Sequence, residues 1–348
     1  MLNQSGRVHL DRTVSNALRI FFELLVLFHH LYKPQTAFGE YISLAGGPVA
    51  VGGFMFFSGY GIGLSYIKDS TAYLKKLTRK RIPTTYLTIV VVNLFYLISF
   101  YLRGNSFDSA FSFIVSVLYL PVFKSFKYLS NWIYFLADLL IYYIVFVLLA
   151  LIHKRKVEKL KNIALWFIVL AVILCITLSV LTLTSGNSMQ MRGIFLFPLG
   201  LLFANGKEKI TPFIKKHKFK LACPLFLLGV CLLIIFAQDY FYFGEGVLGL
   251  LCTVMIEYFV GPLIVLAIMI FCWGISLKCK FIDKASLLVL YVYVSHEFFF
   301  KSFQHLLPSL HWALIMLLTL FYAILTAIVI VIINTEIKAH RQRVKNKT

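Results

Sequence analysis

The opening apolar segment of this 348-residue chain holds Arg19, Glu23 and the doublet of His29 and His30, and three of these four ionisable side chains, Arg19, Glu23 and His30, have helical spacing. At about 100° per helical residue, the step from Arg19 to Glu23 leaves a net rotation of about 40°, and the step from Arg19 to His30 leaves about 20°. All three therefore share one helical face. Ionisable groups inside a membrane are costly and usually mark function. A cation, an acid and an imidazole on one face predict anion binding coupled to proton transfer.

A purely structural role for these three residues is also compatible with the sequence. Arg19 would then snorkel to the inner headgroups, and His30 would only cap the outer end of the helix. In the functional interpretation, an imidazole that exchanges protons near neutral pH acts as general base. Arg19 and His30 are about 16 Å apart along the axis, so they would act at two points of one cavity. Glu23 lies between them and is placed to pair with Arg19 at i, i+4.

The composition places this face in a membrane protein, since the chain is 60% hydrophobic and only 14% charged. Soluble domains have about 25% charged residues. The apolar runs have the length needed to cross about 30 Å of hydrocarbon. We expect an all-α, polytopic bundle of about ten transmembrane helices. The predicted spans are 15–32, 46–67, 83–102, 131–152, 162–183, 189–205, 219–237, 247–276, 286–304 and 311–333.

Two irregular segments need a separate interpretation. The segment 107–123 contains Asp108 and Pro121 and is predicted to be interfacial or re-entrant. The run 247–276 is long and contains Gly261 and Pro262, which predict a kink within one span. No repeat or long linker divides residues 1–348, so we expect a single domain with cytoplasmic tails at 1–13 and 335–348.

The cations predict the orientation of the bundle. With the N-terminus in the cytoplasm, 27 Lys and Arg residues fall in inner segments and 5 in outer loops. This bias follows the positive-inside rule and places both termini in the cytoplasm, in the cell (cytoplasmic or inner) membrane. The net charge of +20 lies in short loops, which argues against a nucleic-acid partner. The six cysteines have neither disulfide nor metal-ligand spacing, and no metal is expected.

Several motifs resemble the family 3 membrane acyltransferases in order and spacing. They are RIFFELLVLFHH from Arg19, GGFMFFSGYGIG from Gly52, LTRKRIPTTY from Leu77, SNWIYFLADLLIYY from Ser130, and the later stretches MRGIFLFPLGLLF and SLLVLYVYVSHEFFF. The resemblance covers residues 14 to about 305. Arginine, ten intervening residues and histidine are the family's signature, which selects His30 over His29, although the doublet leaves His29 as an alternative.

The resemblance implies an integral membrane O-acyltransferase. Such a protein transfers an acyl group, often acetyl, from acyl-coenzyme A to a sugar of a surface polysaccharide or glycolipid. Arg79, Lys80 and Arg81 would then bind coenzyme A at the inner face, since Arg and Lys are good phosphate partners. Ordinary positive-inside charge with anionic lipid is the alternative for these cations. The loop from these arginines to the proline is one residue shorter than usual for the family.

Four more residues are candidates for substrate binding: Trp132, Ser58, His296 and Arg192. Trp132 is equally well explained as an aromatic anchor at the interface. Ser58 could accept an acyl group, but no adjacent base is evident, and the glycines around it are expected to serve helix packing. His296 resembles the family's late histidine. Arg192 and Asp138 are expected to pair across helices as a clamp.

Two other classes of protein compete with the transferase. A glycan or lipid flippase or polymerase would use the charged face as a substrate path and would need no acyl-coenzyme A. A scaffold without chemistry would rarely place Arg19, Glu23 and His30 on one face. The acceptor, the acyl chain and the choice between direct transfer and an enzyme intermediate are left open by the sequence.

Overall fold

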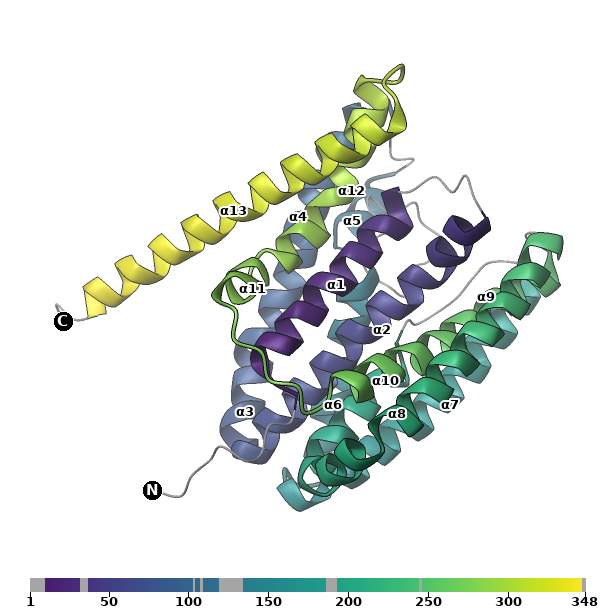
Figure 1. The fold of residues 1–348 in the computed structure, drawn as a ribbon. Coiled ribbons are helices and arrows are strands. Elements are labelled where there is room, and N and C mark those ends of the chain that lie inside the picture. The colour runs from purple at the N-terminus through teal and green to yellow at the C-terminus, as the bar shows by residue number, and fades with distance from the viewer. Residues whose placement is uncertain are drawn as a thin grey trace. The chain divides into compact units, whose positions relative to one another are not determined.

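The computed structural model describes residues 10–31, 37–102, 104–106, 109–118, 134–185, 193–243 and 246–345. These ranges contain helices and turns and no strand, which confirms the predicted all-α class (Figure 1). Within them, 7 helices are long and apolar enough to cross a membrane. Helices α1 and α12 are outside this set because charged and histidine side chains interrupt their apolar sequence. The count of about ten spans depends on such polar helices.

The chain divides into two compact units, each described by itself. The first comprises Met1–His29, Lys33–Tyr86 and Phe135–Lys278. Its elements are α1 (Arg12–Leu31), which ends in the other unit, α2 (Ala37–Lys68), α3 (Ser70–Lys76), the π-helix η2 (Leu77–Arg81), α6 (Tyr134–Ile152), the 3₁₀ turn η3 (Val157–Lys159), α7 (Leu160–Ser185), α8 (Leu196–Phe243), α9 (Val247–Met255), the π-helix η4 (Ile256–Val260) and α10 (Gly261–Cys272).

The second unit comprises His30–Tyr32, Leu87–Tyr134 and Cys279–Thr348. Its elements are most of α4 (Ile82–Leu102), α5 (Ala110–Leu118), α11 (Lys280–Ala285), α12 (Val289–Leu306) and α13 (Trp312–Lys345). Helices α12 and α13 pack on each other, with Phe299 and Phe303 against Tyr322 at ring distances of 5.7 and 5.4 Å. The single domain with cytoplasmic tails stays a prediction.

The packing of α2 on α8 depends on residues without side chains. A Cβ at Gly59 would lie 2.0 Å from the Phe197 carbonyl oxygen, and one at Gly200 would lie 2.3 Å from the Phe56 carbonyl oxygen. The two backbones are therefore in direct contact. This confirms the predicted packing role of the glycines of α2, except at Gly61, where a Cβ would meet nothing within 4 Å.

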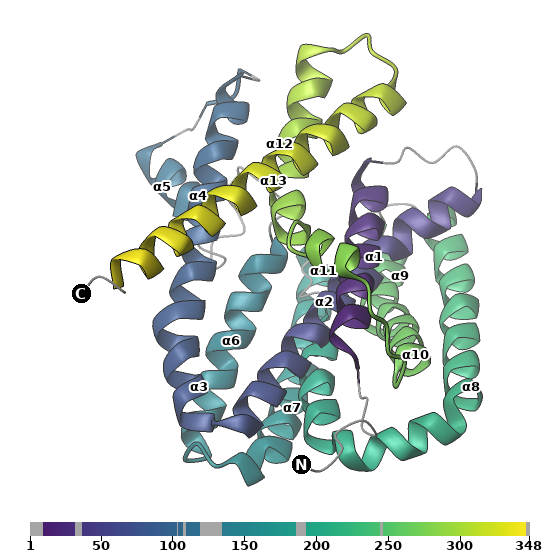
Figure 2. The ribbon, with the colours of Figure 1, turned by 60° about the vertical axis from the view of Figure 1, so that its left-hand side comes forward.

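Helix α8 combines two predicted spans. The ranges 189–205 and 219–237 were expected to be separated by a basic loop. In the described part, two helices instead meet directly across a kink at His217 (φ −116°, ψ 17°), and together they span 48 residues. A straight helix of this length would measure about 72 Å, far more than one bilayer crossing. Figure 2 shows that its path instead turns sharply between two arms. The lysine-rich segment is thus helical, because lysine is a good helix former.

Other helix boundaries in the structure differ from those predicted from the sequence. The basic stretch before the predicted span 83–102 was expected to be a loop, but it is helical through α3 and η2. The predicted kink in 247–276 takes the form of the π-helix η4, which directly precedes Gly261, and one candidate span, Leu248–Cys272, covers the region. Of the segment 107–123, residues 110–118 form α5; Asp108 and Pro121 lie outside the described residues.

We expect Gly59→Ala to destabilise the protein by about 1–3 kcal/mol or more, because an extra methyl group meets backbone that cannot rotate away. Gly61→Ala is the matched control, since it sits on the same helix with open space around it. Thermal unfolding in detergent would compare the two. Equal melting temperatures for both variants would contradict the close contact between α2 and α8.

Candidate functional site

The guanidinium groups of two arginines approach each other in the first unit. Arg19 comes from α1 and Arg81 from the last residue of η2, and both side chains are exposed. They lie close enough to repel each other electrostatically. Among the described residues, neither forms an ion pair with a carboxylate. Two adjacent cations without an acid between them have the chemistry to bind an anion.

Aromatic side chains hold these guanidinium groups in place. Arg81 donates a hydrogen bond of 3.0 Å from Nη1 to the hydroxyl of Tyr73, and its Cζ lies 5.7 Å from the ring centre of Tyr143. Arg19 lies over the ring of Phe57 at 5.5 Å. The three aromatic residues are buried. They orient the cations without neutralising them, through cation–π contact and a neutral acceptor. We call Arg19, Arg81, Tyr73, Tyr143 and Phe57 the guanidinium site.

The π-helix explains how Arg81 reaches this site. A π-turn closes its hydrogen bonds at i→i+5, so the side chains that follow are rotated relative to an uninterrupted α-helix. Arg79 and Lys80 belong to the same turn and are exposed. Of the three cations predicted to bind coenzyme A, only Arg81 is held against other side chains of the site.

Ser58 lies beside the guanidinium site. Its hydroxyl donates to the Phe54 carbonyl oxygen at 2.8 Å, four residues earlier in α2, and it is hydrogen-bonded with Tyr143. The hydroxyl is thus engaged by the backbone and by a phenol. A hydroxyl engaged in this way is less suited to act as an acyl-accepting nucleophile, and the substrate-contact role of Ser58 stays a prediction.

Glu23 does not pair with Arg19, so the expected i, i+4 ion pair is wrong. Glu23 is 4% exposed, and both of its carboxylate oxygens are buried without a hydrogen-bond partner in the described part of the chain. Arg19 instead extends toward Phe57 and Arg81. The shared helical face therefore carries an exposed cation and, one turn later, a buried acid.

In the second unit, His30 and His296 form a stacked pair. Their ring centres are 5.6 Å apart and their planes differ by 24°. His296 is fully buried, lies 5.9 Å from the ring of Tyr293, and donates from Nδ1 to the Val292 carbonyl oxygen at 3.3 Å. Next to it, Glu297 is buried and forms an ion pair with Lys301. His296 of α12 is thus in contact with His30, the histidine that the sequence analysis selected.

The neighbouring His29 serves a different purpose. Its Nδ1–H donates to the carbonyl oxygen of Ser43, and its Cβ would lie 3.4 Å from a Cβ placed at Gly46. His29 therefore joins α1 to α2 within the first unit. The doublet separates into a packing histidine and a histidine stacked on another imidazole.

The remaining candidates are only partly described. Trp132 and Arg192 lie outside the described residues, so the clamp between Arg192 and Asp138 stays a prediction. Asp138 is buried and, together with Glu257 of η4, interacts electrostatically with Tyr142. Sequence reasoning missed Tyr73, Tyr143 and Phe57. No sequence signal distinguishes these aromatic residues from the many others in apolar spans.

The family assignment follows from sequence comparison together with this fold. A family described as an acyltransferase domain, the acyltransferase 3 family, matches residues 14–335. The chain belongs to this family, which confirms the resemblance of its motifs. With several helices able to cross a membrane, the protein is a multi-pass membrane acyltransferase. No curated protein and no solved structure gave a significant match.

We expect Glu23→Met to raise thermal stability, because it removes a buried carboxyl group that has no hydrogen-bond partner among the described residues, and burial of such a group costs about 1–3 kcal/mol. Glu158→Met on exposed η3 is the control and should change stability by no more than about 0.5 kcal/mol. Unfolding of both variants in the same detergent would test this. A large loss of stability for Glu23→Met would show that the carboxyl group has a partner in the native protein.

Proposed function

We propose that the protein transfers an acetyl group from acetyl-coenzyme A to a sugar hydroxyl of a surface polysaccharide or glycolipid, with His30 as general base. Family membership supports acyl transfer. The observation that carries the assignment of the base is the stacked contact of His30 with His296, at 5.6 Å between ring centres. His29, the competing candidate, is engaged with the Ser43 carbonyl.

The proposed reaction balances with one proton that is transferred twice. A nitrogen of the His30 imidazole takes the proton of the sugar hydroxyl as its oxygen attacks the thioester carbonyl carbon. The new carbon–oxygen bond forms, the carbon–sulfur bond breaks, and coenzyme A leaves as a thiolate that takes the proton from the imidazolium. Positioned proton transfer of this kind contributes about 10²–10⁴-fold to a rate. His296 would orient the His30 ring through its stacked contact.

The guanidinium site would bind the donor. Coenzyme A carries several phosphate charges, and guanidinium groups bind phosphate through paired, charge-assisted hydrogen bonds. Arg81 and Arg19 are the favoured contacts because they are exposed, oriented and not ion-paired with a carboxylate in the described residues. Exposed Arg79 and Lys80 would add to the local positive potential. Arg19 and His30 belong to one continuous helix, α1.

This proposal includes the membrane topology. The cation-rich ends of the spans, including the end of η2 that holds Arg81, would face the cytoplasm, where acyl-coenzyme A is made available to the enzyme. Both termini would lie on that side, with about ten helices crossing the cell membrane once α1 and α12 are counted. Trp132, Ser58, His296 and Arg192 remain the proposed contacts for substrates.

We expect His30→Ala to lower acetyl transfer in membranes by about 10²-fold or more, because no other group would accept the hydroxyl proton. His29→Ala is the matched control and should retain most activity while losing some stability. Incorporation of labelled acetyl into glycan, with equal membrane insertion checked by immunoblot, would measure both. Retained transfer in His30→Ala would refute the assigned base.

Coenzyme A should raise the melting temperature of the purified protein, because a ligand that binds only the folded state stabilises it by mass action. Arg81→Gln should weaken this effect by about tenfold in apparent affinity, the loss expected for one charged hydrogen bond. Arg155→Gln removes an exposed arginine between α6 and α7 and serves as control. The absence of any shift with coenzyme A in the unmodified protein would favour a flippase or polymerase.

A further inference from the structure

A pocket lined by lysines lies at the bend of α8 in the first unit. It encloses about 430 Å³ and is lined by Lys215, Lys216, Lys218 and Lys220 together with Trp273 and Gly274. Gly274 has φ +75°, and a Cβ there would lie 2.6 Å from Cε of Lys215. Only a residue without a side chain therefore leaves room for the methylene groups of Lys215. Lysine is a good partner for phosphate, so a hollow lined by four lysines suits a phosphate group.

The floor of this lysine pocket is fixed by a buried indole. Trp273 is fully buried, and its Nε1–H donates to the Thr211 hydroxyl at 3.0 Å, which joins the end of α10 to α8. The non-helical residue His217 interrupts α8 at the same level. The lysines therefore lie at a bend of α8 and not on the surface of an uninterrupted helix.

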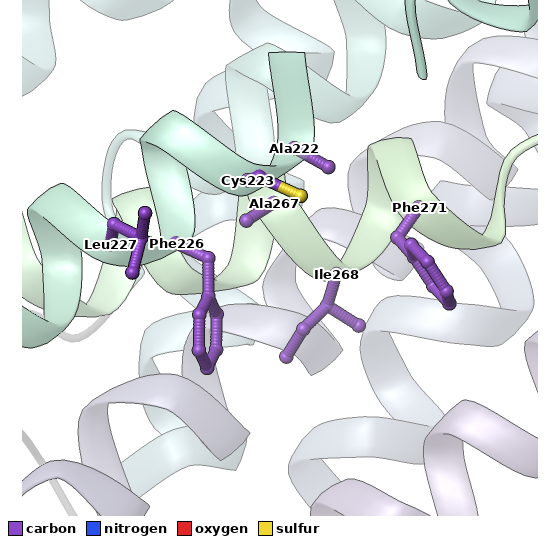
Figure 3. Close-up of a pocket in the computed structure, with 7 residues that line it drawn as sticks. All are labelled: Ala222, Cys223, Phe226, Leu227, Ala267, Ile268 and Phe271. Atoms are coloured by element: carbon purple, nitrogen blue, oxygen red, sulfur yellow. The ribbon is translucent and has the colours of Figure 1, made fainter. Parts of the chain in front are cut away.

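An apolar groove begins where the lysine pocket ends. Figure 3 shows Cys223, Phe226 and Leu227 of α8 beside Ile268 and Phe271 of α10, around a hollow of about 420 Å³. A second hollow of about 600 Å³ continues from it, shares Phe226 and Ile268, and extends to α1 and α2. The side chains that line both hollows are almost entirely apolar.

Phe271 connects the two parts. Its ring lies 6.0 Å from Nζ of Lys218 and 5.9 Å from the ring of Phe219, which also lines the lysine pocket. Within α10, the lining of the two hollows runs from Ile264 to Phe271, which is about 10 Å at 1.5 Å per residue. Trp273 and Gly274 of the lysine pocket follow directly after the helix ends at Cys272. The groove and the pocket therefore extend over much of one leaflet, whose depth is half of a hydrocarbon core of about 30 Å.

We propose that this face binds an anionic phospholipid, with its phosphate in the lysine pocket and an acyl chain along the groove between α8 and α10. The charge complementarity selects an anionic head, and the adjoining groove selects a molecule that carries a hydrocarbon tail. Basic pockets beside membrane helices are the expected receptors for such lipid heads. This site shares no residue with the guanidinium site, and the inference does not depend on the proposed transfer reaction.

The test measures lipid retained by the full chain. The protein is reconstituted in nanodiscs that contain phosphatidylcholine with or without phosphatidylglycerol, extracted into mild detergent, and analysed by native mass spectrometry. We expect one phosphatidylglycerol to be retained in preference to phosphatidylcholine. The triple variant Lys215→Gln, Lys218→Gln, Lys220→Gln should lose this retention by about tenfold or more. The charge-matched control is Lys154→Gln, Lys156→Gln, Lys161→Gln, which should retain the lipid.

A second pair of variants tests the groove. Cys223→Trp would fill it and should also reduce retention, whereas Cys231→Trp is exposed on the same helix and lines neither hollow. Equal retention in Cys223→Trp and Cys231→Trp would overturn the proposal. So would full displacement of the lipid by inorganic phosphate or coenzyme A, which would assign the lysines to a free anion. Loss of a dimer in Cys223→Trp would assign the groove to a second copy of the chain.

Discussion

The contact between α2 and α8 constrains the geometry of the guanidinium site. Gly59 and Gly200 bring the two backbones together so closely that neither position has room for a methyl group. One face of α2 is thereby committed to α8. Phe57 lies two residues before Gly59, on a different face of α2, and its ring is in contact with Arg19. Residues without reactive groups thus determine where reactive groups lie, because close helix packing in a membrane relies on small side chains.

The described charges are distributed unequally between surface and interior. Arg19 and Arg81 are exposed and held by aromatic rings, whereas Glu23 is buried. Glu297 is also buried, but it has Lys301 as its ion-pair partner. An acid that is kept buried without such a partner lowers stability, and natural proteins commonly accept that cost at functional sites. Glu23 therefore keeps its place among the candidate residues although its expected partner is wrong.

Hydropathy predicted where apolar helices occur but not where they end. The lysine-rich segments before α4 and within α8 were expected to be loops. The first is helical throughout, and the second is helical on both sides of the kink at His217. A helix satisfies its own backbone hydrogen bonds in water and in lipid alike, so leaving the membrane does not require the helix to stop. The two π-helices, η2 and η4, were also not predicted, because the widened turn of a π-helix does not change the hydropathy pattern of the sequence.

The sequence by itself determined the all-α class, the family and the helical face shared by Arg19, Glu23 and His30, because composition and a period of 3.6 residues are local properties. Only the tertiary structure decided which partners those residues meet. It separated His29, bound to Ser43, from His30, stacked on His296. It also brought phenols from α3 and α6 to Arg81. The contacts of His30 with His296 and of Arg81 with Tyr143 join segments far apart in the chain, and packing, not local periodicity, brings them together.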